Sequence, residues 1–220
     1  MKNRGLLDSE LYEARFRFKE RRSNFRFFCV LLVIFVCFLF LRVWWVNSFS
    51  RVIVDGWSMK ATLSDEQELL MRYVDKNHKA QRGDIIVVYV GDYEECRDVG
   101  SLYIIKRLIA IAGDKVRCVN GQVQIQYAGT DKFVNLVEPY AYYGTDKAKD
   151  AYDFDEYEVH TGEIFFLGDN RSGPGASVDS RYKDYPNGSR LNDRLYKEKD
   201  IYGIVPNWAL KHSNFLSKIV

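Results

Sequence analysis

The chain has 220 residues and a formal net charge of +2, which leaves room for a short anchor and one domain of ordinary size. A charge this close to neutral argues against a nucleic-acid-binding protein. The charge is nevertheless uneven, because residues 1–26 contain eight basic and four acidic side chains. This segment therefore carries +4 and the remainder −2, so we expect residues 1–26 to form a basic tail on the cytoplasmic side of a membrane.

An apolar stretch over residues 27–46 follows this tail. Twenty residues in an α-helix rise roughly 30 Å, which matches the thickness of the hydrocarbon core. Arg42 is its only charged residue and lies near the end, where its side chain can reach the headgroups beside two interfacial tryptophans. A cleaved signal sequence is the alternative, but the stretch is long for one and residues 47–50 make a poor cleavage site. We therefore predict one transmembrane helix, a cytoplasmic N-terminus and an external domain over residues 47–220.

Beyond residue 46 the sequence changes to short apolar runs separated by turn residues, which is typical of β-structure. Residues 116–125 predict a hairpin, because Asn120-Gly121 supplies the two positive-φ residues of a type I′ turn. Residues 138–160 are rich in Tyr, Asp and Lys, and we expect them to form a surface excursion, either a solvated loop or a small cap hairpin. No other stretch outside the anchor keeps a 3.6-residue apolar period over three turns, so we predict a mainly β domain. The other expected strands lie at residues 52–54, 67–74, 84–90, 102–111, 163–167 and 200–205.

Metal and histidine chemistry are disfavoured. The three histidines lie far apart without a second ligand at metal spacing, so we expect no metal site and no cofactor. Each histidine also lies in a polar, loop-like context, which disfavours a buried general base of the Ser-His-Asp type. Cys96 and Cys118 could form a disulfide or remain free thiols, and the sequence leaves both open.

A hydrolase without a catalytic histidine needs another base, and Lys106 is the candidate. Lysine titrates near 10.4 in water, so it is protonated at neutral pH. Burial disfavours the charged form and lowers the pKa by up to about 3–5 units, which makes a neutral amine available as a base. Lys106 lies inside the apolar run of residues 102–111, as this chemistry requires. A solvent-facing position on a half-buried strand is the competing interpretation for this run taken alone.

Ser58 is the candidate nucleophile. It follows an apolar strand and Gly56, which permits a sharp turn, about a dozen residues after the apolar stretch. An ordinary serine at the end of a strand is the competing interpretation. Lys60 is close in sequence but has no apolar enclosure. Residues 180–183 match S-x-x-K, but the companion motifs of penicillin-binding enzymes are absent or out of order.

Four segments, in chain order, resemble the sequence boxes of type I signal peptidases, the bacterial leader peptidases. The nucleophile box S-M-x-P-T-L resembles residues 55–63, DGWSMKATL, and R-G-D before a hydrophobic strand resembles residues 82–87. The lysine box, I-K-R followed by G-D, resembles residues 105–114, and G-D-N-R…S-x-D-S-R resembles residues 168–181. Any one box is weak. The ordered set behind an N-terminal anchor covers nearly the whole chain and favours the catalytic interpretation of both the serine and the lysine.

The resemblance implies an external domain of two antiparallel β-sheets and a serine endopeptidase with a Ser–Lys dyad. Ser58 would attack the scissile carbonyl, Lys106 would act as the base, and Ser177 would orient the lysine amine. The Ser58 backbone N–H would stabilise the oxyanion. Gly56 stands where some relatives carry a serine whose hydroxyl assists, so a second donor would have to be a different group, with the backbone of Gly56 as a candidate. The resemblance further assigns Met59 and Ile104 to the substrate pocket, and Asp169, Asn170, Arg171, Asp179 and Arg181 to the scaffold.

The implied substrates are exported preproteins with small residues at positions −1 and −3, cleaved outside a bacterial cell membrane whose lipid bilayer holds the anchor. No nucleic acid partner is expected. Specialised processing or assembly of pilins or surface proteins is the alternative that the sequence leaves open. The chain departs from the family pattern where Ala61 and Ala112 replace prolines and where Ile104 replaces a tyrosine. Residues 172–176 also lengthen the stretch before Ser177.

Overall fold

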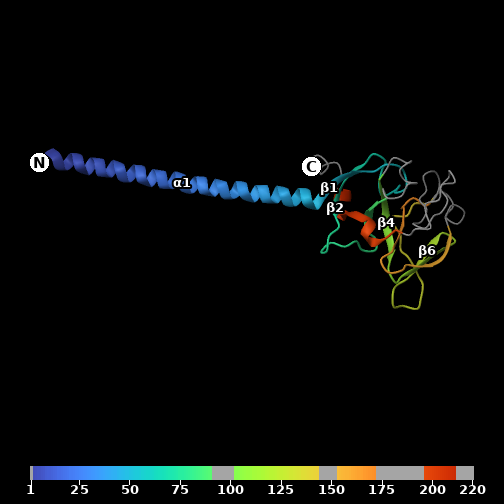
Figure 1. Ribbon diagram of the computed structural model, residues 1–220. Helices are drawn as coiled ribbons and strands as arrows, with labels where there is room; N and C mark the ends of the chain where they lie inside the picture. Colours follow the sequence, from blue (N-terminus) through green and yellow to red (C-terminus); the bar gives the residue numbers. More distant parts are fainter. Residues whose placement is uncertain (1, 91–101, 144–152, 172–195, 212–220) are drawn as a thin grey trace. The chain divides into compact units, whose positions relative to one another are not determined.

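The chain divides into two units, Met1–Ser48 and Phe49–Val220. The first unit is a helix, and the described part of the second is mainly β-structure (Figure 1). The computed structural model describes residues 2–90, 102–143, 153–171 and 196–211.

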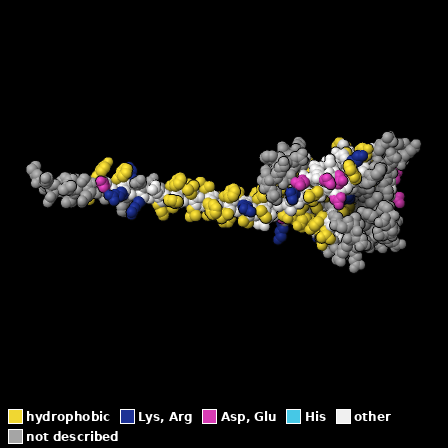
Figure 2. Space-filling view, turned by 90° about the horizontal axis from the view of Figure 1, so that it is seen from above, with side chains coloured by type: hydrophobic (Ala, Val, Ile, Leu, Met, Phe, Trp, Pro, Cys, Tyr) yellow, Lys and Arg dark blue, Asp and Glu magenta, His cyan; other side chains and the backbone are white. Residues whose placement is uncertain are grey.

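The first unit is one long helix, α1 (Lys2–Ser48). Its part Asn24–Ser48 is long and apolar enough to cross a membrane, and this part includes the predicted span of residues 27–46. Figure 2 shows hydrophobic side chains along much of the helix. Residues 2–26 continue the same helix, because they contain no proline and a single glycine.

The larger sheet of the second unit has six antiparallel strands in the order β1-β2-β10-β3-β4-β9. Strand β10 comes from near the C-terminal end of the described chain, yet it lies between β2 and β3. A short 3₁₀ helix, η1, precedes β10, and helix α4 follows it. The bounds are β1 Phe49–Ile53, β2 Glu68–Tyr73, β3 Ile85–Tyr89, β4 Tyr103–Ile111, β9 Ile164–Leu167, η1 Glu198–Asp200, β10 Ile201–Val205 and α4 Asn207–Lys211.

The smaller sheet has four antiparallel strands in the order β7-β6-β5-β8. Its central hairpin confirms the predicted turn, with φ of 51° at Asn120 and 73° at Gly121. Both backbone N–H groups of this turn donate to the Asp153 carboxylate at 2.7 Å, which fixes the turn from outside the hairpin. The bounds are β5 Lys115–Val119, β6 Gln122–Gln126, β7 Val134–Asn135 and β8 Phe154–Glu158.

The expectation that residues 138–160 form a solvated loop or a separate hairpin is wrong at β8. This strand pairs with β5 and completes the smaller sheet. Its sequence FDEYE has only two apolar rings among three acids, so the alternation of a half-buried strand is hidden. Phe154 and Tyr157 pack against the core that surrounds Phe165, at 5.4 and 6.3 Å between ring centroids.

Strands β4 and β9 lie between two hydrophobic cores. Leu108 and Phe166 belong to the first core, which also contains residues of β3 and β10. Ile109 and Phe165 belong to the second, which contains residues of the smaller sheet. Successive side chains of a strand point to opposite faces, so a strand that is buried on both faces must be apolar without alternation. This explains the continuous apolar runs of the sequence and confirms a mainly β domain of two antiparallel sheets.

Candidate active site

The turn after β1 carries Ser58. Gly56 has a φ of 88°, a conformation that a residue with a side chain rarely adopts, and the chain reverses there. The Gly56 N–H donates to Asp65 Oδ1 at 2.8 Å, and the Lys60 N–H donates to the Trp57 carbonyl at 3.0 Å. These bonds hold Ser58 in a short, closed turn that leads from the edge strand of the larger sheet.

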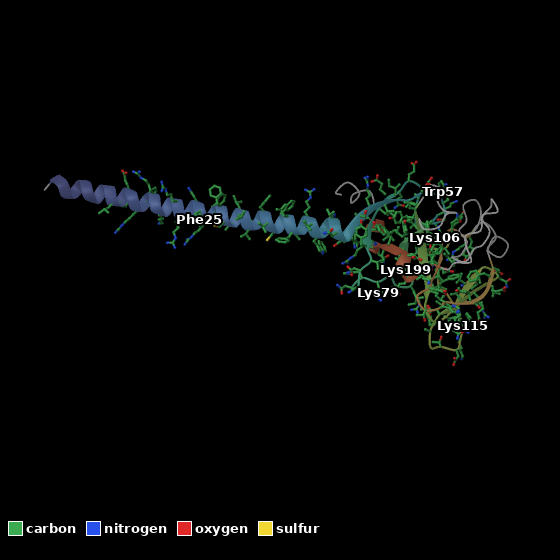
Figure 3. The ribbon with its side chains drawn as sticks, viewed as in Figure 1. Phe25, Trp57, Lys79, Lys106, Lys115 and Lys199 are labelled. Carbon is green, nitrogen blue, oxygen red and sulfur yellow. The ribbon has the colours of Figure 1, made fainter. Side chains whose placement is uncertain are left out.

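Lys106 lies in the middle of β4, opposite Ile86 of β3. Its Nζ donates a hydrogen bond of 2.6 Å to Ser58 Oγ, so the fold brings together two residues that are 48 positions apart. Figure 3 shows Lys106 in the same region as Trp57, the neighbour of Ser58. The serine and the lysine that the sequence singled out are therefore in direct contact, and only the fold supplies that contact.

The surroundings of Lys106 favour its neutral form. The residue as a whole is half-buried, but its amine is enclosed, and burial lowers its pKa from 10.5 to about 8. The negative charge of Asp169 acts in the opposite direction and raises the pKa in part. Since burial is the larger effect, a substantial fraction of the amine is neutral near pH 8.

Asp169 links the strand of the lysine to the turn of the serine. Its buried carboxylate accepts two hydrogen bonds from Arg107, at 2.8 Å from Nε and 2.5 Å from Nη2. The same carboxylate accepts a short hydrogen bond from the Thr62 hydroxyl. Arg107 also donates to the Gly83 carbonyl at 2.7 Å. Two parallel bonds between a guanidinium and a carboxylate fix orientation as well as distance. The Asp169 carboxylate therefore holds the segment that contains Thr62 against strand β4, which contains Arg107.

Arg171, which was predicted as a scaffold residue, forms a second buried ion pair with Glu138, and this partner was not predicted from the sequence. Arg171 donates to the Gly168 carbonyl at 2.6 Å and to Glu138 Oε1 at 2.5 Å, and both charged side chains are buried. The ring of Tyr140 lies 3.9 Å from the Arg107 guanidinium carbon, and Tyr142 pairs with Asn170. The beginning of the segment expected to be a loop is therefore packed against the site. The closely spaced tyrosines in residues 138–143 were the available signal.

The structure also shows the surroundings of the other predicted site residues that it describes. Met59 is 1% exposed and belongs to the core, and Ile104 is half-buried and packs beside the first core. The Gly56 N–H, the candidate for the second oxyanion donor, donates to the Asp65 carboxylate in this structure. Cys118 is a buried free thiol. Ser177, Asp179, Arg181 and Cys96 lie outside the described residues.

Within the part of the chain that the structure describes, no group of three or more His, Cys, Asp or Glu side chains is placed to hold a metal ion.

Comparisons with known proteins identify the family. Residues 25–205 match the family model described as signal peptidase, peptidase S26. Signal peptidase I U of Bacillus subtilis (strain 168) is 32% identical over 171 residues, which cover 74% of this chain and 80% of that protein. Signal peptidase I of Streptococcus pneumoniae serotype 4 is 30% identical over 172 residues, which cover 70% of this chain and 78% of that protein. The chain belongs to the signal peptidase family, peptidase S26.

This result confirms the predicted class, a serine endopeptidase that removes signal peptides. A crystal structure of a signal peptidase I from Enterococcus faecalis V583 also matches, at 24% identity with a TM-score of 0.39. The match covers 58% of this chain and 97% of that one, and a likeness with so low a TM-score says nothing about the site.

Proposed function

We propose that Ser58 and Lys106 form the catalytic dyad of this peptidase. The observation that carries the proposal is the 2.6 Å contact between Lys106 Nζ and Ser58 Oγ, together with the lowered pKa of the amine. A lysine that is neutral near pH 8 accepts a proton, whereas an ordinary lysine does not. A serine hydroxyl within hydrogen-bond distance of such a base is an activated nucleophile.

The reaction proceeds through an acyl-enzyme. The neutral Lys106 amine accepts the proton of Ser58 as Oγ attacks the scissile carbonyl carbon, and the carbonyl oxygen becomes an oxyanion near the Ser58 N–H. The resulting ammonium then protonates the leaving amine of the mature protein, and an ester to Ser58 remains. In the second half, Lys106 accepts a proton from water, whose oxygen attacks the ester carbonyl carbon. The bond from Ser58 Oγ to the acyl carbon then breaks, Lys106 returns the proton to Oγ, and the signal peptide leaves with its new carboxyl group.

The ion pair of Arg107 and Asp169 supports this chemistry electrostatically. An isolated carboxylate near Lys106 would stabilise the ammonium form and remove the base. Here the Arg107 guanidinium binds the Asp169 carboxylate through two hydrogen bonds, so part of its charge is compensated. Asp169 can therefore connect the two catalytic segments without fully reversing the effect of burial on Lys106.

The proposed setting is a bacterial cell membrane, with residues 1–26 in the cytoplasm, residues 27–46 across the bilayer and residues 47–220 outside. The basic tail and the apolar part of α1 support this orientation. The substrates would be exported preproteins with small residues at positions −1 and −3. Ile104 lies two residues before Lys106 on β4, so its side chain shares a face with the lysine, which suits a place in the substrate pocket.

The remaining assignments rest on the family resemblance. Ser177 would orient the lysine amine, and Asp179 and Arg181 would belong to the scaffold. Met59 would contribute to the substrate pocket only as a buried wall, because its side chain is 1% exposed.

The proposal is tested by cleavage of secreted preproteins with the detergent-solubilised full-length enzyme. We expect cleavage after a small-x-small motif, and loss of cleavage in both Ser58→Ala and Lys106→Met. Lys60→Met tests the other lysine near the nucleophile, and Lys199→Met, at an exposed position, is the matched control (Figure 3). Activity that survives in Lys106→Met would contradict the assigned base. Cleavage of a single pilin or surface protein, but no general preprotein, would favour the specialised role.

A further inference from the structure

We infer that Asn170 is a positioning residue that aims the Ser58 backbone N–H at the oxyanion, an inference that rests on the proposed function of Ser58. Two hydrogen bonds from Asn170 reach the nucleophile turn. Its side-chain Nδ2 donates to the Trp57 carbonyl at 3.0 Å, and its backbone N–H donates to the Ser58 carbonyl at 3.0 Å. The donor and the acceptors are more than 110 positions apart in sequence, so the contact exists only in the folded chain.

The first of these bonds acts on the oxyanion donor through the geometry of the peptide bond. The Trp57 carbonyl and the Ser58 N–H belong to the same planar peptide unit, and the described chain has no cis peptide. In a trans unit the C=O and the N–H point in opposite directions. A donor that holds the Trp57 oxygen on one side therefore fixes the direction of the Ser58 N–H on the other side.

The second bond fixes the peptide on the other side of Ser58. With both flanking carbonyls held by one residue, the φ and ψ angles of Ser58 have little freedom, and its hydroxyl stays directed toward Lys106. The Lys60 N–H holds the Trp57 oxygen as well, at 3.0 Å. Among the described residues, no backbone carbonyl accepts a hydrogen bond from the Ser58 N–H.

Asn170 is itself held rigidly. The residue is 0% exposed. Each of its two sequence neighbours, Asp169 and Arg171, belongs to a buried ion pair. Its backbone forms a bridge with Tyr142, whose N–H donates to the Asp169 carbonyl at 2.7 Å. An oxyanion donor is effective when it is oriented before the reaction, because no reorganisation is then required in the transition state. The buried network gives Asn170 this property.

The test is a kinetic comparison of Asn170→Leu with the wild type, at a pH where the activity has reached its plateau. Leucine keeps the number and the branching of the heavy atoms of asparagine and removes the donor. We expect kcat to fall on the order of tenfold to a hundredfold, less than for a deleted donor because the Ser58 N–H remains. The KM and the pKa of the acid limb of the pH profile stay unchanged. The affinity for a peptide aldehyde, whose adduct with serine carries the oxyanion, falls in proportion to kcat.

Two controls distinguish a positioning role from a general loss of stability. Asn135→Leu, in the exposed strand β7, should leave kcat unchanged. Thermal unfolding checks that Asn170→Leu is folded, and Asn170→Ala replaces it if it is not. A folded variant with wild-type kcat, or one in which only KM or the pKa of the acid limb changes, overturns the inference. Inactive wild-type enzyme, or activity in Ser58→Ala, would instead contradict the proposed dyad.

Discussion

The pH dependence of cleavage follows directly from the surroundings of Lys106. With a pKa of about 8, about one amine in ten is neutral at pH 7 and about nine in ten at pH 9. We therefore expect kcat/KM to rise about tenfold between these values and to level off above pH 9. The assay is cleavage of a short preprotein at constant ionic strength, with substrate well below KM. A rate that keeps rising beyond pH 10, as for an ordinary lysine, would refute the buried base, and so would a flat profile.

The same pKa shift predicts an effect on stability. The folded pKa of about 8 lies below the ordinary value of 10.5, so the unfolded chain binds more protons between these two values. The free energy of unfolding consequently rises with pH across this window. Below pH 8 the buried amine is protonated, and the cost of burying that charge lowers the free energy of unfolding by about 3 kcal/mol. Lys106→Met removes the penalty, so at pH 7 it should stabilise the fold by up to that amount. Chemical unfolding at pH 7 and pH 10.5 measures this, and a stability difference that does not shrink at the higher pH would contradict the reasoning.

Three further substitutions test other parts of the structure. Asp169→Asn removes a charge that raises the pKa of Lys106, so the acid limb of kcat/KM should move to lower pH, and a shift to higher pH would contradict the assigned electrostatics. Glu138→Gln leaves the buried Arg171 without its counter-ion and should lower the free energy of unfolding by about 3 kcal/mol or more, whereas a loss below 1 kcal/mol would mean that solvent reaches the pair. Gly203→Ala places a Cβ 2.8 Å from a methionine sulfur and 2.9 Å from a strand carbonyl. Urea unfolding should therefore show that the free energy of unfolding falls by about 1–3 kcal/mol. An unchanged free energy of unfolding would show that the strands can separate there.

The sequence was informative where the chemistry is local. The type I′ turn at Asn120-Gly121 follows from the backbone freedom of two neighbouring residues. Most strand positions can be predicted from apolar runs, because the apolar composition of a run can be read from its own residues. Strand β8 was missed since its stability comes from pairing with β5 and from two rings on the second core, neither of which is visible in its own five residues.

The sequence by itself determined which serine and which lysine are candidates, since an apolar strand around Lys106 and the order of the boxes are local facts. Only the tertiary structure decided that these two side chains lie 2.6 Å apart and that burial exceeds the charge of Asp169 in setting the lysine pKa. The same holds for the bond from Asn170 to the Trp57 carbonyl, because every residue has a backbone carbonyl and the sequence cannot show which one a distant amide reaches. Residue types set the chemical groups that are present, and folding sets the distances and surroundings that make them reactive.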